Sequence, residues 1–196
     1  RRAMVYPTVT EAQDRRRRYA SLRLALVRTV QQLAAEGTIP AVVRHVWEQV
    51  PRYARAEAGA LVWTTCRWGE LRTIDWGYTA SEGRVWVSMP KVGEMRQAPR
   101  VPAASRTIWE RVEHPVTLPM RSRRNVAEAI RQAIRSAELR APRGIKSGTH
   151  AVRHLTASAL AAEGEDVEEI ATRLGHASTE STRQYIHPMQ EWRPAS

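Results

Sequence analysis

Apolar residues recur at intervals of three and four along most of this chain, a spacing that fits an α-helix and not a strand. The pattern predicts a first helix from residue 11 to 36, and Gly37 stands where that helix would end. A second helix is expected over 42–50, up to Pro51, and a third over 52–65. This spacing favours a bundle of helices.

One stretch, from residue 74 to 102, departs from that pattern because its apolar and polar residues alternate. Val85, Val87 and Met89 share one face of the expected strand, and a turn around Gly93 leads into a second short extended segment. Such alternation is typical of a β-hairpin. The predicted fold class is therefore mainly α with a small antiparallel β-sheet.

Helical spacing returns after Pro102 and is clearest from residue 122 to 140. Val126, Ile130 and Ile134 would face the core, and a basic loop over 140–146 follows. The opposite face of this helix carries cations, namely Arg124, Arg131 and Arg135. An earlier run, 15–18, is entirely arginine and is expected to be the solvent face of the first helix, with a phosphate-contacting patch as the alternative.

The C-terminal quarter of the chain predicts three short helices. Thr149 is expected to cap the first, and Asp166 with Glu169 resembles a capping box at the start of the second. The third would run from about residue 179 through Tyr185. Trp192 is the one apparent anchor for the tail, which could dock on its own chain or on a neighbour.

The charge of the chain points to a polyanion as its partner. The 196 residues include 31 Lys plus Arg and 20 Asp plus Glu, so the formal net charge is +11. A basic surface attracts nucleic acid and speeds encounter with it, although charge alone also fits a ribosomal, membrane-surface or simply well-solubilised protein. Hydrophobic residues make up 42% of the sequence, enough to fill one core, and a single domain over 1–196 is expected.

Two features restrict the class of protein further. Cys66 is the only cysteine, which excludes an internal disulfide and a cysteine-based zinc cluster and fits a reducing cytoplasm. No apolar run reaches the roughly 18 residues of a membrane span. The chain begins at Arg1, not at Met, so we expect it to be a piece of a longer protein.

His150 and His154 lie four residues apart, a spacing that can hold zinc on one helix face. The glutamate of the metalloprotease motif is missing, however, and Arg153 would place a positive charge beside the cation. We therefore expect no metal site.

Five short motifs in this sequence resemble the tyrosine recombinases, also called the phage integrase family, in both order and approximate spacing. H-A-V-R-H at 150–154, L-G-H-A-S at 174–178 and Tyr185 are similar to the C-terminal signature of that family. T-T-C-R-W-G-E-L at 64–71 resembles its first arginine box. The expected hairpin also fits, because Lys91 stands five residues before Arg96, as in the segment that bears the family's catalytic lysine.

The resemblance implies a catalytic set that needs no metal and no cofactor. Its members are Arg67, Lys91, His150, Arg153, His176 and Tyr185. Supporting residues would be Glu70, His154 and His187. Contacts to DNA are expected from Arg96, Arg124, Arg131 and Lys146.

Each catalytic role has a chemical reason. Two arginine forks from separate segments would clamp the charged phosphodiester, as a metal ion could. Tyr185 would be the nucleophile, His150 its base and His176 a hydrogen-bond donor to a nonbridging oxygen. Lys91 would then protonate the departing 5′ oxygen. Arg153 lies between Val152 and the apolar stripe of its expected helix, where an unpaired arginine is costly unless it meets an anion.

The resemblance implies the catalytic domain of a site-specific recombinase that joins DNA through a 3′-phosphotyrosine. Its partner would be double-stranded DNA, and the full-length protein would act as a tetramer while this piece is monomeric. We expect the N-terminal core-binding domain to be absent from this piece. The setting would be the cytoplasm, on the nucleoid, in a bacterium, phage, plasmid or other mobile element.

Two other functions stay open at this point. The first is related chemistry in a type IB topoisomerase or a telomere resolvase. The second is a DNA-binding module that kept the fold without catalysis, although the intact set of polar residues argues against it.

Overall fold

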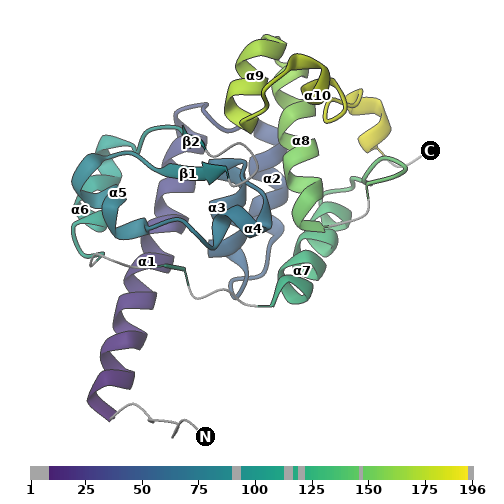
Figure 1. Ribbon diagram of the computed structural model, residues 1–196. Coiled ribbons are helices and arrows are strands. Elements are labelled where there is room, and N and C mark those ends of the chain that lie inside the picture. The colour runs from purple at the N-terminus through teal and green to yellow at the C-terminus, as the bar shows by residue number, and fades with distance from the viewer. Residues whose placement is uncertain (1–8, 90–93, 113–116, 119–121, 146–147, 194–196) are drawn as a thin grey trace, which may run out of the picture.

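The computed structural model describes residues 9–89, 94–112, 117–118, 122–145 and 148–193 (Figure 1). Helices pack around one core, and a two-stranded sheet lies against one side of them. The longer helices in chain order are α1 (Val9–Ala35), α2 (Ala41–Gln49), α3 (Arg55–Thr64), α7 (Arg123–Ser136), α8 (Gly148–Ala162) and α9 (Val167–Leu174). Shorter elements are α4 (Trp68–Leu71), α5 (Trp76–Glu82), β1 (Trp86–Met89), β2 (Glu94–Gln97), the 3₁₀ turns η1 (Ala103–Ser105) and η2 (Met189–Trp192), α6 (Arg106–Trp109) and α10 (Thr179–Arg183).

The predicted fold class is confirmed: the chain is mainly helical with a small antiparallel sheet. The first three helices begin and end within a few residues of the predicted bounds. The apolar face of α7 is buried as expected, with Val126, Ile130 and Ile134 each at most 3% exposed. Helical spacing in the sequence therefore located the core correctly.

The core is centred on α3, which is buried from Ala56 to Thr64 and packs against α1 and α8. Trp63 of α3 lies 5.9 Å from the rings of both Trp76 and Trp109, so three indoles fill one region of the core. Buried Glu57 pairs with Arg23 of α1 at 2.6 Å, which fixes α1 against α3. This packing holds the C-terminal end of α3 in place.

The prediction for residues 74–102 is wrong in part, because the first third of this region is a helix and not a strand. Asp75 accepts a hydrogen bond from the Gly77 N–H and caps α5, and Gly83 ends that helix at a φ of 62°. These local signals outweigh the alternation of apolar residues. The hairpin itself is confined to β1 and β2, which pair antiparallel with Val87 opposite Arg96. The turn around Gly93 lies outside the described residues.

Helix ends in the C-terminal half also differ from prediction. Helix α8 already begins at Gly148, so Thr149 lies inside it and is not its cap. Gly148 packs closely on α7: an added Cβ would lie 2.1 Å from the Ala127 carbonyl oxygen. Helix α7 stops at Ser136, four residues early, and Glu138 follows with a φ of 56°.

The last two helices are shorter or less capped than the sequence suggested. Asp166 occupies the N-cap of α9, but its side chain makes no capping hydrogen bond. Helix α10 ends at Arg183, so Tyr185 lies in the turn that follows it. The position of Tyr185 therefore depends on contacts other than helical hydrogen bonds.

The two ends of the described chain behave differently. The first turns of α1 extend away from the body of the molecule (Figure 1), and the arginines at 15–18 are exposed as expected. Trp192 is fully buried in the core of its own chain, and its carbonyl accepts the Arg140 N–H at 2.7 Å. Within the described part of the chain, none of the helices combines the length and apolar character that a membrane crossing requires.

Candidate active site

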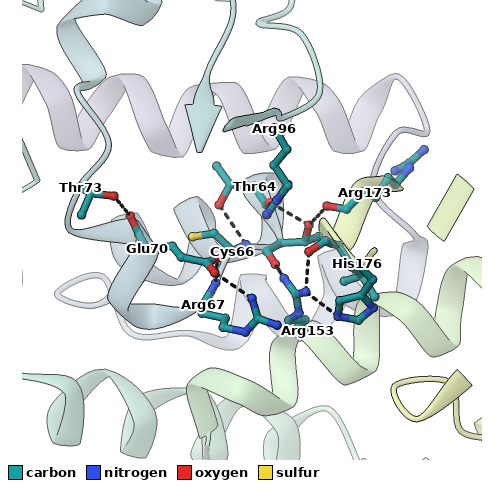
Figure 2. A network of polar contacts seen from close by, with 11 residues as sticks. Thr64, Cys66, Arg67, Glu70, Thr73, Arg96, Arg153, Arg173 and His176 are labelled. Carbon is teal, nitrogen blue, oxygen red and sulfur yellow. Dashed lines mark hydrogen bonds and ion pairs between the residues drawn. The ribbon is translucent and has the colours of Figure 1, made fainter. Parts of the chain in front are cut away.

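Three segments that are distant in the sequence meet beside the C-terminal end of α3. They are the turn at 64–67 that leads into α4, the middle of α8, and the stretch from the end of α9 to Tyr185. Figure 2 shows how Arg67 and Arg153 approach each other below the turn, with His176 beside Arg153. The chemistry of the site depends on how each segment fixes its side chains.

The turn at 64–67 places Arg67 at the N-cap of α4. Thr65 has a φ of 49°, which is unfavourable for a β-branched residue, and its hydroxyl donates to the Arg173 carbonyl at 2.6 Å. Both Glu70 oxygens accept from Arg67, one from its N–H and the other from Nη1, at 2.8 Å each. The Arg67 side chain is still 38% exposed. Its guanidinium is therefore oriented but accessible.

Arg67 and Glu70 both stay charged in this arrangement. Burial alone would raise the pKa of Glu70, but the hydrogen bonds from Arg67 bring it below its usual range. Burial lowers the pKa of Arg67, yet Glu70, and then a contact with Tyr185, raise it above its usual value. Both groups are ionised at neutral pH, and Arg67 lies next to the candidate nucleophile.

Arg153 is the most deeply buried cation of the site, with 1% of the residue exposed. From the middle of α8 it donates to the carbonyls of Thr65 and Leu174, and at 2.8 Å to Nε2 of His176. Burial lowers its pKa to about 10, and neighbouring Arg67 acts in the same direction. Arg153 stays charged at neutral pH and joins all three segments of the site.

His176 is held between two partners that define its protonation. Arginine can only donate, so Nε2 accepts from Arg153. The other nitrogen, Nδ1, lies 3.0 Å from the hydroxyl of buried Thr182. Burial lowers the pKa of His176 to about 4, and Arg153 and Arg67 add to this. The ring is therefore neutral at neutral pH, and we assign its proton to Nδ1.

Tyr185 lies with its ring among three histidines and a guanidinium. The ring centroids of His154, His176 and His150 are 4.4, 4.8 and 5.3 Å from its own. Cζ of Arg153 lies 5.2 Å from the same centroid. The residue is half-buried. Its phenol is therefore beside both arginines and beside rings that can accept a proton.

His150 and His154 differ in their partners, although both lie on α8. Burial, and then Arg153 and Arg67, lower the pKa of His150, and this ring is free to accept a proton at neutral pH. Burial lowers the pKa of His154 to about 4, and its Nδ1 lies 3.2 Å from Nε2 of His187. Among the described residues, no group of three or more His, Cys, Asp and Glu could hold a metal ion.

The predicted lysines and the predicted DNA-contacting arginines differ in where the structure places them. Lys91 and Lys146 lie outside the described residues. Arg124 is exposed on α7, and Arg131 is partly exposed and pairs with Glu128 at 2.6 Å.

Arg96 requires a correction. It is only 7% exposed, which does not fit an interpretation as a DNA contact, and it donates to the Thr64 carbonyl from behind the turn at 64–67. Its Nε and Nη1 have no hydrogen-bond partner in the part of the chain that the structure describes. The alternation of β2 explains this, because Arg96 occupies the face that points into the protein.

Sequence reasoning missed the groups that orient the arginines. Two of them are the backbone carbonyls of Thr65 and Leu174, which carry no signature in a sequence because every residue has one. Thr182, three residues before Tyr185, belongs to the same C-terminal signature, but the sequence gives it no role; in the structure it is buried and fixes His176.

The site has an excess of positive charge. Arg67, Arg96 and Arg153 lie close enough for each to affect the pKa of another, and Glu70 is the carboxylate among them. Buried or half-buried cations without matching anions favour binding of an anion. Two of these cations flank a phenol, so the arrangement can bind a phosphate ester and present a nucleophile to it.

Comparison with known proteins adds an independent line of support. Residues 45–191, about three quarters of the chain, match the sequence profile of the phage integrase family. The crystal structure of XerA recombinase matches with a TM-score of 0.51 and 20% identity, covering 74% of this chain and 58% of XerA. XerH site-specific recombinase, in a pre-cleavage complex with its difH substrate, matches with a TM-score of 0.52 and 20% identity, covering 74% and 48%.

These matches show that the chain has the fold of a tyrosine recombinase catalytic domain. It spans about half the length of the solved recombinases. No curated protein sequence matches the chain significantly.

Proposed function

The chain belongs to the phage integrase family, and we propose that it is the catalytic domain of a site-specific recombinase that cuts and rejoins DNA through a phosphotyrosine. The observation that carries this proposal is the position of Tyr185, whose ring lies against Arg153 and among the three histidines, while Arg67 contacts the same residue. A tyrosine that only packs in the core would not need two cations and a base around it.

The arginines would bind the scissile phosphate. Arg153 is fixed by two backbone carbonyls before any DNA arrives, so its orientation costs nothing at the moment of reaction. Its Nε has no partner among the described residues and is a candidate donor to phosphate oxygen. Arg67 would add a second fork from the accessible side. Because two guanidinium groups meet the charge of the phosphorane, we propose that the reaction needs no metal.

Cleavage would proceed in one displacement. The Tyr185 oxygen attacks phosphorus, the bond from phosphorus to the 5′ oxygen breaks, and the DNA 3′ end becomes a phosphotyrosine. His150, neutral at neutral pH, would take the phenol proton. Lys91 is our candidate for the acid that protonates the leaving 5′ oxygen. Attack by another strand's 5′ hydroxyl reverses these steps and reseals DNA without ATP.

His176 needs a change of hydrogen bonding to act on the phosphate. In this structure its Nε2 accepts from Arg153, so it cannot donate from that atom. A phosphate beside the ring would raise its pKa and favour a second proton on Nε2. That proton could then bind a nonbridging oxygen while Nδ1 keeps its contact with Thr182.

The partner would be double-stranded DNA. Arg124 and Arg131 of α7, together with Lys146, would contact its phosphates. We propose that 1–196 is one catalytic domain and that a core-binding domain belongs to the rest of the protein, which would assemble as a tetramer on its DNA site. The setting would be the cytoplasm of a bacterial host of a mobile element.

The test is covalent capture on nicked duplexes whose sequence is randomised, so that the unknown target is selected from the pool. A nick just downstream of the cleavage point lets the short released fragment, which carries the 5′ hydroxyl, diffuse away, and this traps the phosphotyrosine. We expect an adduct that survives detergent, disappears in Tyr185→Phe and persists in Tyr78→Phe, which changes an exposed tyrosine. Equal adduct in Tyr185→Phe would overturn the assignment.

A further inference from the structure

Helix α8 presents two residues, one turn apart, to the segment that contains Tyr185. His154 lies under the Tyr185 ring, with a centroid distance of 4.4 Å and an interplanar angle of 21°. Ser158 receives the His187 N–H at 2.9 Å and donates its hydroxyl to the Tyr185 carbonyl at 3.4 Å. The side chains of His154 and His187 then meet at 3.2 Å.

These contacts close a loop around the nucleophile. The Tyr185 ring stacks on His154, and the Tyr185 carbonyl accepts a hydrogen bond from Ser158. His187, two residues later, contacts both His154 and Ser158. Resting on the function proposed above, we infer that His154 and His187 form a clamp that positions the Tyr185 ring for attack on the phosphate. We call this pair the histidine clamp; it is a positioning device and not part of the reacting set.

Tyr185 needs such support because its own segment provides little. Helix α10 ends at Arg183, and two backbone bonds continue the turn: the Tyr185 N–H donates to the Thr182 carbonyl at 2.8 Å, and the Ile186 N–H donates to the Arg183 carbonyl at 3.2 Å. Neither bond restrains the side chain of Tyr185. A half-buried phenol on a turn has rotational freedom. A misplacement of about 1 Å in a reacting group can slow a reaction on the order of 10²-fold. A stacked ring that is itself anchored removes much of that freedom.

The hydrogen bond inside the clamp also demands a defined protonation state. One imidazole must donate and the other accept, so the two rings cannot both be in the cationic form, which has no acceptor nitrogen. The groups that face the pair are His150 and Arg153 beside His154, and Glu191, whose Oε2 lies 3.7 Å from Nδ1 of His187. Burial, and then His150, His187 and Arg153, lower the pKa of His154 and keep it neutral, so it can serve as one half of the bond.

Two variants at His187 test the hydrogen bond of the clamp and leave the His154 ring in place. His187→Ala removes the hydrogen bond, whereas His187→Gln can place an amide group near the position of Nε2 and restore it. His45→Ala changes an exposed histidine on α2 and serves as the matched control. Thermal unfolding of each variant shows whether the fold is retained.

The first readout does not depend on catalysis: the NMR signals of the Tyr185 ring in protein with labelled tyrosine, assigned with Tyr185→Phe. We expect His187→Ala to shift and broaden these signals, His187→Gln to bring them back toward wild type, and His45→Ala to leave them unchanged. Unchanged signals in His187→Ala overturn the clamp, whatever the activity.

The second readout is the single-turnover rate of adduct formation on nicked duplexes recovered from the randomised pool. We expect His187→Ala to be slower by about 10-fold at saturating DNA, with DNA affinity unchanged, because the clamp acts on orientation. His187→Gln should recover most of the rate. A loss of DNA affinity with an unchanged rate overturns the clamp, whereas a wild-type protein that forms no adduct but shows the NMR shifts overturns the proposed function and leaves the clamp standing.

Discussion

The two sides of the pocket are built by different means. On the arginine side, which comprises the turn at 64–67 together with Arg153, a buried guanidinium is bound to backbone carbonyls from two other segments. On the tyrosine side, which comprises His150, His154, His176 and the segment 185–187, half-buried rings contact one another.

The difference follows from what each side has to do. Groups that stabilise a transition-state charge work best when they are fixed in advance. A nucleophile that is joined to DNA and then released has to move. On the arginine side, we expect substitution of a buried arginine to lower both the stability of the fold and the rate of adduct formation, and substitution of an accessible arginine to lower chiefly the rate. On the tyrosine side, we expect mild acid to lower the stability of the fold, because its histidines become protonated.

The largest effect is expected from Arg153→Ala. The carbonyls of Thr65 and Leu174 would lose their charged donor, and each buried acceptor left unpaired costs about 1–3 kcal/mol. We expect the free energy of unfolding, measured in urea, to fall by that order, and adduct formation to fall by at least about 10³-fold. Arg124→Ala, an exposed arginine on α7, is the control and should unfold like wild type. Wild-type stability in Arg153→Ala would mean that these carbonyl contacts do not hold the segments together.

A smaller and more selective effect is expected from Arg67→Ala. The Arg67 side chain is 38% exposed, and the bond from its N–H to Glu70 survives the substitution. The Glu70 side chain is only 7% exposed and would keep its backbone bond alone, while the Arg67 end of the pair is open to water. We therefore expect a loss of about 1 kcal/mol, smaller than that of Arg153→Ala. Adduct formation should still fall by about 10² to 10³-fold, because one of the two forks on the phosphate is lost.

Arg67→Lys distinguishes charge from geometry at the same position. Lysine keeps the positive charge but not the planar fork, so its rate should lie between those of wild type and Arg67→Ala. If Arg67→Ala unfolds as readily as Arg153→Ala, the distinction between a buried and an accessible arginine fails.

The sequence predicts the reacting side chains of the site better than it predicts their surroundings. Arg67, Arg153, His176 and Tyr185 were each identified by a short motif, and the structure brings all four together although the first and last are more than a hundred residues apart. The order of the motifs was sufficient for this, because each motif fixes one side chain on one element.

What failed or was missed depends on the surroundings of a residue. The carbonyl of Leu174 has no residue-specific signal, and Arg96 looks like any basic residue until its strand face is known. The alternation over 74–102 does not predict helix α5, although Asp75 and Gly83 mark its two ends. The type and position of the long helices were predictable; the short helix α5 and the inner face of a short strand were not.

The smallest effect concerns pH, and it separates the two sides most directly. His154 and His176 both have pKa values lowered to about 4, in each case chiefly by burial, against 6.5 for an ordinary histidine. Between about pH 6.5 and 4 the unfolded chain therefore binds more protons at these positions than the folded chain does. The free energy of unfolding must then fall as the pH drops through this window.

Groups outside the pair also titrate near this range, and Glu165, whose burial raises its pKa, acts in the opposite direction. The difference between wild type and a variant cancels their contribution. We expect His176→Gln to show a shallower dependence of unfolding free energy on pH between 6.5 and 4, measured by urea denaturation at each pH, and His45→Ala to keep the wild-type slope. An unchanged slope in His176→Gln would show that this ring is not held neutral by the folded site, and the tautomer assigned from the Arg153 contact would lose its basis.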